Sequence, residues 1–302
     1  MAESSAVASS PVASPMQRPA SPSHLEPMHV FAGTDESQYV ATKVLEHSFK
    51  KHASGPVILH PMTADGIPMP KDKENRPRTG FSFCRFTIPE RMGFKGRGLY
   101  VDADMLVFAD VAELWRIPFG EQKVLCTYQG DPPPAWRDNK FFHRGRQFSV
   151  MLLDCERLPW RIDDIVQGLD EKRYTYPQLM FELCLVKPHE IEDRIPPGWN
   201  HLEHYEPGDT RLIHYTVVPT QPWKHRGNPF GHLWDRALAE AVDAGAVTGR
   251  DLEIGVEKGH LHVDLLRFRP RVAGRSLSER MFDSLSNRWV RVRAAFSGGR
   301  LR

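Results

Sequence analysis

The sequence predicts an α/β protein built around a mostly parallel central sheet. Its opening alternates strand and helix: short apolar runs at residues 29–33 and 56–60 flank a segment at 36–52 whose apolar residues share one helical face. Strands that alternate with helices in this way form parallel sheets. A second observation is that Asp102 and Asp104 follow a buried strand. Ligands of open α/β sheets bind at the carboxyl ends of strands, so this position also favours an α/β fold.

Later segments extend this pattern along the chain. Residues 98–101 read as a strand that leads straight into the two acidic residues, and residues 81–86 fit a helix or a strand. The other expected elements are strands at 148–153 and 211–213, helices at 176–184 and 229–247, and a loop rich in Pro, Gly and His at 193–210. His260 and His262 alternate as on one face of a solvent-facing strand, and no third metal ligand accompanies them.

Composition limits the classes of protein to which the chain can belong. Of its 302 residues, 40% are hydrophobic and 26% are charged, as in soluble globular domains. The formal net charge is only +2, so we expect no nucleic-acid partner. The 4 cysteines form no CxxC pair, which favours free thiols in a reducing cytosol over a disulfide framework or a zinc site.

The chain divides into three segments by composition. Residues 1–27 are rich in Ser, Pro and Ala and lack the basic start and apolar stretch of a secretory signal, so we expect a disordered tail. Residues 28–266 carry the alternating apolar segments and are expected to form one domain. Residues 267–302 form a basic C-terminal segment in which arginines alternate with apolar and aromatic residues.

Asp102 and Asp104 are candidate metal ligands. Two acids flanking one residue occur by chance in many chains, but these carboxylates interrupt a strongly apolar segment, and a buried charge requires a partner. A divalent cation is one such partner, because carboxylate and phosphate oxygens are hard ligands that suit Mg²⁺ or Mn²⁺. The alternative is a strand-end turn in which both acids are solvated.

The acidic segment carries a resemblance to a known family. Residues 99–107, LYVDADMLV, followed by Glu113-Leu114-Trp115, resemble the "YLDxDxxV…LW" signature of glycosyltransferase family 8. Other stretches resemble segments of that family in the same order: residues 31–35 with Tyr39, 83–86, 148–153 and 214–224. The resemblance covers about residues 28–235. It implies a nucleotide-sugar-binding fold of the GT-A, Rossmann-like type, with residues 28–266 as the catalytic domain of a metal-dependent, retaining glycosyltransferase (a hexosyltransferase) that uses a nucleotide sugar, usually linked to UDP.

The resemblance also implies roles for individual residues. Asp102 and Asp104 would bind Mn²⁺ or Mg²⁺ together with His214, which matches the third protein ligand of the family, although a lone His at a strand end is more often structural. The residues implied to contact the nucleotide sugar are Phe31, Ala32, Gly33, Thr34, Asp35, Tyr39, Arg85, Val101, Asp102, Ala103 and Lys224. Asp35 fits a helix cap equally well.

Several positions depart from the family pattern. Ser149 stands where the family usually has Asn, Met151 stands where it usually has Gly, and Gln178 lies where its "DQD" segment is expected. Ser149 and Gln178 are therefore the candidate catalytic residues, and no carboxylate suited to a double displacement is identifiable. Gln221 precedes Pro-Trp in place of Lys, so Lys224 becomes the candidate contact to phosphate. These departures keep open a nucleotide-sugar-binding protein that is catalytically weak or inactive.

The expected partners are a nucleotide-sugar donor and a glycan, lipid-linked or other hydroxyl acceptor. Basic and apolar residues mixed as in residues 267–302 are typical of a surface segment that lies on anionic lipid. This composition is compatible with a cytoplasmic protein that makes peripheral contact at the inner face of a membrane. The competing interpretation is an ordinary terminal helix packed on the domain with its arginines in water.

Overall fold

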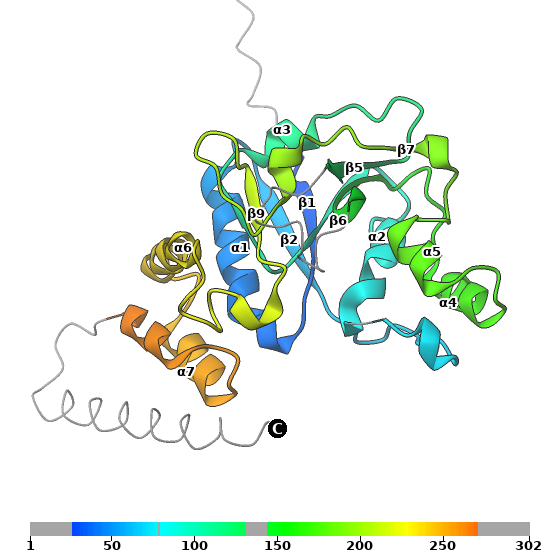
Figure 1. Cartoon of the computed structure of the whole chain (residues 1–302). Coiled ribbons are helices and arrows are strands. Elements are labelled where there is room, and N and C mark those ends of the chain that lie inside the picture. The colour runs from blue at the N-terminus through cyan, green and yellow to red at the C-terminus, as the bar shows by residue number, and fades with distance from the viewer. Residues whose placement is uncertain (1–25, 78, 131–143, 271–302) are drawn as a thin grey trace, which may run out of the picture.

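The computed structural model describes residues 26–77, 79–130 and 144–270, which form two sheets surrounded by helices (Figure 1). The strands are β1 Met28–Gly33, β2 Val57–Met62, β3 Arg97–Asp102, β4 Met105–Val107, β5 Val124–Gln129, β6 Gly145–Asp154, β7 Ile191–Glu192, β8 His201–Leu202 and β9 Leu212–His214. The α-helices are α1 Tyr39–His52, α2 Ile88–Arg91, α3 Val111–Trp115, α4 Ile162–Asp170, α5 Tyr176–Phe181, α6 Gly231–Asp243 and α7 Gly249–Glu257. The 3₁₀ helices include η1 Glu36–Gln38, η3 Gly80–Thr87, η6 Pro197–Asn200, η7 Val218–Thr220 and η8 Val263–Phe268.

The larger sheet has six strands in the order β2-β1-β3-β6-β5-β7. Strand β1 pairs in parallel with β2 and β3, and β5 pairs in parallel with β7. Strand β6 runs antiparallel to its neighbours β3 and β5, so within this sheet the other described strands share one direction. The predicted mostly parallel α/β architecture is confirmed. A smaller sheet has the order β4-β9-β8.

Alternating side chains divide the core between the two faces of the larger sheet. Val30, Leu99 and Leu152 point to the face covered by α1 and α3. Phe31 and Tyr100, their neighbours in sequence, point to the opposite face, where η3, α4 and α5 pack. Figure 1 shows helices α1 and α4 on opposite sides of the sheet. The arrangement has three layers, as expected when helices cover both faces of a sheet.

Helix α1 links the smaller sheet to the larger one. Its residues Leu45 and Phe49 pack against the larger sheet. Val44, on another face of the same helix, packs with Ile213 of β9 and Trp234 of α6 in a separate apolar cluster. The i, i+4 spacing of apolar residues in α1 therefore supplies two packing faces. Helices α6 and α7 join the molecule through this second cluster.

Most of the predicted elements are present, with shifted ends. Residues 81–86 lie in a 3₁₀ helix, η3, and the expected loop at 193–210 contains η6 and β8. The prediction of a strand around His260 and His262 is wrong. Gly259 ends α7 with a φ of +73°, and the backbone N–H of His260 donates to the carbonyl of Gly255, so the chain turns back on the helix.

The described residues bear on the segment boundaries only in part. The expected tail, except for residues 26 and 27, lies outside them, as does the basic segment beyond residue 270. The expected boundary after residue 266 falls inside η8, where Leu265 and Leu266 are buried. Among the helices of the described ranges, none is long and apolar enough to cross a bilayer.

Candidate metal centre

Strand pairing brings the two acids and His214 together. Strand β3 ends at Asp102, the chain crosses Ala103 and Asp104, and β4 begins at Met105. Strand β4 pairs antiparallel with β9, in a register that places Met105 opposite His214. The backbone N–H of Tyr215 donates to the carbonyl oxygen of Asp104 at 2.8 Å, which closes the pairing beside the acids. The sheet register therefore determines the convergence of residues that are distant in sequence.

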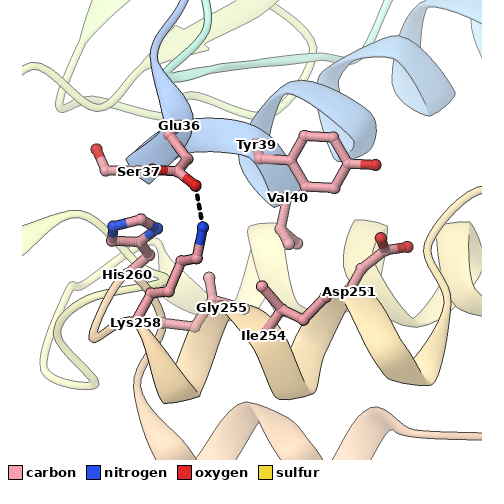
Figure 2. Close-up of a pocket in the computed structure, with 10 residues that line it drawn as sticks. Glu36, Ser37, Tyr39, Val40, Asp251, Ile254, Gly255, Lys258 and His260 are labelled. Carbon is pink, nitrogen blue, oxygen red and sulfur yellow. Dashed lines mark hydrogen bonds and ion pairs between the residues drawn. The ribbon is translucent and has the colours of Figure 1, made fainter.

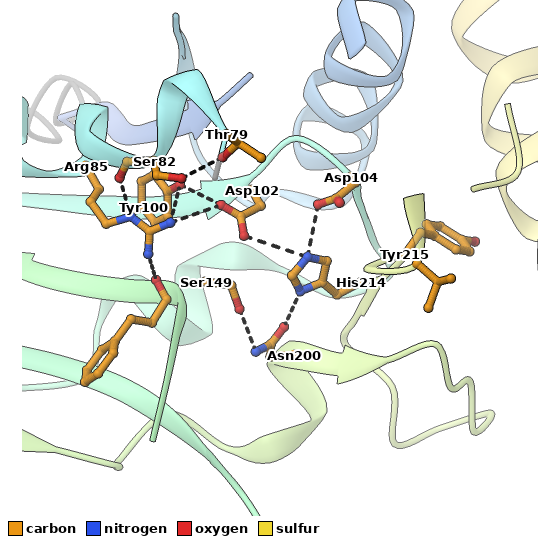
Figure 3. Close-up of polar contacts among 12 residues, drawn as sticks. Thr79, Ser82, Arg85, Tyr100, Asp102, Asp104, Ser149, Asn200, His214 and Tyr215 are labelled. Atoms are coloured by element: carbon orange, nitrogen blue, oxygen red, sulfur yellow. Dashed lines mark hydrogen bonds and ion pairs between the residues drawn. The ribbon is translucent and has the colours of Figure 1, made fainter. Parts of the chain in front are cut away.

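The three side chains face a common point (Figure 3). The Nε2 atom of His214 lies 3.0 Å from Oδ1 of Asp104 and 3.8 Å from Oδ2 of Asp102. One ligand atom from each residue lies within 4.8 Å of the others, and Asp104 and His214 are buried. An octahedral ion with metal–oxygen distances of about 2.1 Å places neighbouring ligands about 3 Å apart. The spacing is thus compatible with one divalent cation.

An unsatisfied carboxylate oxygen strengthens this interpretation. Oδ1 of Asp104 is buried and has no hydrogen-bond partner among the described residues, although Nε2 of His214 lies 3.0 Å away. Leaving a buried acceptor unpaired costs about 1–3 kcal/mol, and more when it is charged. A cation between the two atoms would satisfy both. The donor set, two carboxylates and an imidazole, fits Mn²⁺ and accommodates Mg²⁺ less well.

Arg85 and Tyr100 hold Asp102 from within the core. The Tyr100 hydroxyl donates to Oδ1 of Asp102 at 2.5 Å, and Nη2 of Arg85 donates to the same hydroxyl at 3.1 Å. Arg85 also donates to the carbonyl oxygens of Ser82 and Phe148. Its guanidinium lies 3.7 Å from Asp102 and is buried. Arg85 therefore supplies fixed positive charge beside Asp102.

Burial and neighbouring charges both shift the pKa values of Asp102 and His214. Burial raises the pKa of Asp102 above its usual value, although Arg85 and His214 act against this rise. Burial alone would lower the pKa of His214, but Asp104 and Asp102 raise it overall. The two acids thus favour positive charge on His214, and Arg85 and His214 favour the ionised form of Asp102.

Two amide side chains that sequence reasoning missed contact the cluster. Oδ1 of Asn200 faces Nδ1 of His214 at 3.0 Å, and Nε2 of Gln221 donates to Oδ2 of Asp104 at 3.0 Å. Gln221 also donates to the carbonyl oxygen of Tyr215. The replacement of the family's Lys by Gln221 was visible in the sequence but did not reveal this contact. Asn200 lies in the segment predicted as a loop, where nothing in the sequence marked it.

Glu203 is a further buried acid beside the cluster. Its carboxylate accepts a hydrogen bond from the backbone N–H of Val217 at 2.7 Å, and its own N–H donates to the carbonyl oxygen of His214. Its φ of +49° is uncommon for a non-glycine residue. Burial is the main cause that raises the pKa of Glu203. Glu203 fixes the chain that follows β9.

The residues expected to contact the nucleotide begin at the carboxyl end of β1. Ala32 is buried, as are Phe31, Val101 and Ala103. The Thr34 hydroxyl shares a hydrogen bond with Thr42, and Asp35 caps η1 by accepting from the N–H of Ser37. Asp35 therefore acts as a helix cap, which was one of the two roles expected for it. Gly33 lies where a Cβ would meet the Tyr100 hydroxyl at 2.5 Å.

Tyr39 lines a pocket of about 270 Å³ between the start of α1 and α7 (Figure 2). Its walls carry the Glu36–Lys258 ion pair and the exposed side chain of Ile254. None of Asp102, Asp104 and His214 lines this pocket, so the structure does not bring Tyr39 to the cluster through it.

The other predicted residues differ in their relation to the cluster. Ser149 accepts a hydrogen bond from Asn200 and so joins it through His214. Gln178 is exposed and forms a capping box with Thr175 at the start of α5, and no described contact links it to the acids. Lys224 is partly exposed, and within the described ranges no carboxylate pairs with its ammonium.

Comparisons with known proteins place the fold. No family model matches the sequence. Protein CDI of Arabidopsis thaliana is 28% identical over 230 residues, which cover 70% of this chain and 83% of that protein. The apo structure of WbbM, a bifunctional glycosyltransferase, aligns with a TM-score of 0.51 at 13% identity over 72% of this chain and 50% of WbbM. The chain thus spans half of WbbM.

A further alignment concerns the galactosyltransferase LgtC, whose structure contains donor and acceptor sugar analogues. It has a TM-score of 0.47 at 12% identity and covers 73% of this chain and all of LgtC. The similarity to WbbM shows a glycosyltransferase fold of the GT-A-like type. At this level of identity the similarity concerns the fold, and the chemistry must be argued from the site.

Proposed function

We propose that the protein transfers a sugar from a nucleotide-sugar diphosphate, a UDP-sugar by the family resemblance, to a hydroxyl acceptor. The observation that carries this proposal is the buried cluster of Asp102, Asp104 and His214, which has an unsatisfied carboxylate oxygen at the carboxyl end of a central strand. The GT-A-like fold and the family 8 resemblance support it. The cation proposed for this site is Mn²⁺, with Mg²⁺ as the alternative.

The chain's own residues would prepare the site for a charged leaving group. A bound cation would neutralise the charge that develops on the departing diphosphate. Arg85, fixed by its three hydrogen-bond acceptors, adds positive charge beside Asp102, and Tyr100 orients that carboxylate. The Lys224 ammonium, free of ion pairs among the described residues, is the proposed contact to phosphate.

Retention of configuration remains part of the proposal. A same-face attack, in which the leaving phosphate accepts the acceptor's proton, needs no protein nucleophile and suits a site in which we identify none. Ser149 and Gln178 are proposed to line the reacting sugar, Ser149 next to the cluster and Gln178 at the start of α5. The acceptor is proposed to be a glycan or a lipid-linked hydroxyl, used by a cytoplasmic protein at the inner face of a membrane.

A second candidate function is nucleotide-sugar binding without turnover. The observation that favours it is Gln221, a neutral side chain that is bonded to Asp104 at the position where the family carries Lys. With no ammonium at that position, less positive charge faces the diphosphate. Donor binding without transfer or hydrolysis would identify this function.

The proposal is tested by measuring Mn²⁺ and UDP binding by calorimetry and UDP-sugar turnover in the wild-type protein and in Asp104→Asn. We expect the wild type to bind UDP only with Mn²⁺ and the variant to lose Mn²⁺ affinity by at least about tenfold, because a charged ligand becomes neutral. Asp243→Asn, which removes an equal charge at the exposed end of α6, is the matched control. Unchanged Mn²⁺-dependent UDP binding in Asp104→Asn would contradict the proposal.

A further inference from the structure

We propose that Asn200 is a positioning residue that fixes His214 in the tautomer protonated on Nδ1, so that Nε2 is left to bind the cation. This inference rests on the proposed function. It gives a role to Asn200, which belongs to none of the motifs found in the sequence. The contact that motivates it is the 3.0 Å separation between Oδ1 of Asn200 and Nδ1 of His214, which is buried.

The contacts of Nδ2 of Asn200 agree with this orientation of its amide. Nδ2 donates to the Ser149 hydroxyl at 2.9 Å and lies 3.3 Å from the Thr127 hydroxyl. With both N–H groups directed at hydroxyl oxygens, Oδ1 is the atom that faces the ring of His214. A carbonyl oxygen only accepts, so the ring nitrogen opposite must carry the proton.

The tautomer of His214 and the orientation of the amide are therefore coupled. If the amide were turned over, Nδ2 would face Nδ1, and the ring proton would move to Nε2, between the two acids. That N–H would lie 3.0 Å from Oδ1 of Asp104, and the nitrogen that faces the two acids would then have no lone pair for a cation. The observed orientation instead directs the lone pair of Nε2 at the space shared with Asp104 and Asp102. Metal-bound histidines are held in this way by the partner of their other nitrogen.

The backbone around Asn200 keeps this amide in place. Asn200 is fully buried at the end of η6, and its carbonyl oxygen accepts a hydrogen bond from Gln129 at 2.7 Å. Trp199 is buried beside it. A Cβ on Gly198 would lie 2.5 Å from the carbonyl oxygen of Asp209, so the turn that precedes Asn200 is closely packed against its neighbour. Asn200 is thus presented to His214 by a rigid segment.

Two substitutions distinguish a role of Asn200 in orienting His214 from a role in stabilising the fold. Asn200→Leu removes the acceptor, whereas Asn200→Asp can only accept and so preserves the proton on Nδ1. We expect Asn200→Leu to weaken Mn²⁺ binding about 10–100-fold, as loss of such a partner does elsewhere, and Asn200→Asp to stay within about threefold of the wild type. Tyr174→Phe is the control: it removes a partly buried hydroxyl that donates to the carbonyl oxygen of Ile165 in α4 at 2.9 Å, so it lowers stability without touching the cluster.

The tautomer itself is measured on the wild type by ¹⁵N-histidine NMR, in one sample with Mg²⁺ bound and in one ion-free sample at alkaline pH. The result therefore does not depend on how the variants fold. A proton on Nδ1 supports the inference, and a proton on Nε2 overturns it. Equal losses of Mn²⁺ affinity in the Leu and Asp variants, or none in a folded Leu variant, also overturn it. If the wild type binds no divalent ion at all, the proposed function fails, while the NMR spectrum of the ion-free protein still decides the tautomer.

Discussion

Gln221 shows how a single substitution changes the surroundings of a charged side chain. Its amide donates hydrogen bonds of 3.0 Å both to Asp104 and to the carbonyl oxygen of Tyr215. Because the amide is neutral, it orients Asp104 without cancelling its charge. One carboxylate oxygen is thereby occupied, and Oδ1 is left for another partner.

Replacing Gln221 with Met should destabilise the fold. Met has a similar volume but donates no hydrogen bond, so the Tyr215 carbonyl and Oδ2 of Asp104 lose their donor. We expect the free energy of unfolding to fall by about 1–3 kcal/mol, as measured by urea denaturation. Saturating Mn²⁺ should restore part of it, because an ion that binds only the folded state stabilises that state. An unfolding curve like that of the wild type would show that these hydrogen bonds contribute nothing.

At the scale of elements, the pairing of β1 with β3 requires a glycine at the end of β1. Parallel pairing places Gly33 opposite Asp102, and Tyr100 lies two residues earlier on β3. The Tyr100 hydroxyl occupies the space in which a side chain at position 33 would begin. Gly33, for which the family resemblance implies a nucleotide contact, therefore also allows Tyr100 to reach Asp102.

The Gly33→Ala variant should disturb both the fold and the cluster. The added Cβ would force the Tyr100 ring to shift, at a cost of about 1–3 kcal/mol in unfolding free energy, and would weaken the hydrogen bond to Asp102. Chemical denaturation and Mn²⁺ titration measure the two effects. Gly130→Ala, where a Cβ meets nothing within 4 Å, is the matched control. Equal stability of the two variants would refute the steric argument.

Helix α7 depends on Asp251 for its attachment. This carboxylate accepts hydrogen bonds from the N–H and hydroxyl of Thr248 in a capping box and pairs with Lys43 of α1 at 2.9 Å. Partial burial acts to raise the pKa of Asp251, but the hydrogen bonds from Thr248 and Lys43 lower it overall, below the usual 3.8. The ionised carboxylate is thus favoured in the folded protein.

This shift predicts a stability difference that depends on pH. A lowered pKa contributes stability above the unfolded-state value, near 3.8, and the contribution disappears as the pH falls through the folded-state pKa. Asp251→Asn should cost about 1 kcal/mol at neutral pH, and the difference from the wild type should shrink below about pH 4. Melting temperatures from pH 3 to pH 7 test this expectation. A difference that stays constant with pH would mean that the charge is not involved.

Sequence patterns predicted the elements better than their pairing. Apolar runs at 29–33 and 148–153 revealed β1 and β6 because a buried strand has a distinctive composition. The direction of β6 and the existence of the smaller sheet were not predictable, since both depend on contacts between distant segments. Asp102 and Asp104 were predicted as metal ligands from their position after a buried strand, and His214 was added through the family resemblance. Asn200 was missed because a buried polar residue in a loop resembles a solvated one until the fold surrounds it.

At the scale of the whole molecule, the basic C-terminal segment carries the prediction about membranes. Arg267 and Arg269 are already engaged, with Asp235 and Glu253. The arginines beyond residue 270 lie outside the described residues, and each would add on the order of 1 kcal/mol of attraction to an anionic surface. We expect the full chain to sediment with anionic but not neutral liposomes at low salt, and a chain ending at Pro270 to stay in solution. Equal sedimentation of both chains would exclude this role.

The division of the cluster between two sheets has a consequence for local opening. Asp102 ends β3 of the larger sheet, whereas in the smaller one Asp104 directly precedes β4 and His214 ends β9. An ion bound by all three residues would link the two sheets, so the smaller sheet could not separate from the larger one without losing a ligand of the ion. Amide protons of β4 and β9 should then exchange with solvent more slowly once Mn²⁺ is added, as followed by deuterium uptake in mass spectrometry. Amide protons of α4, across the larger sheet, should exchange at an unchanged rate. Ion binding would thus suppress local opening on one side of the molecule only.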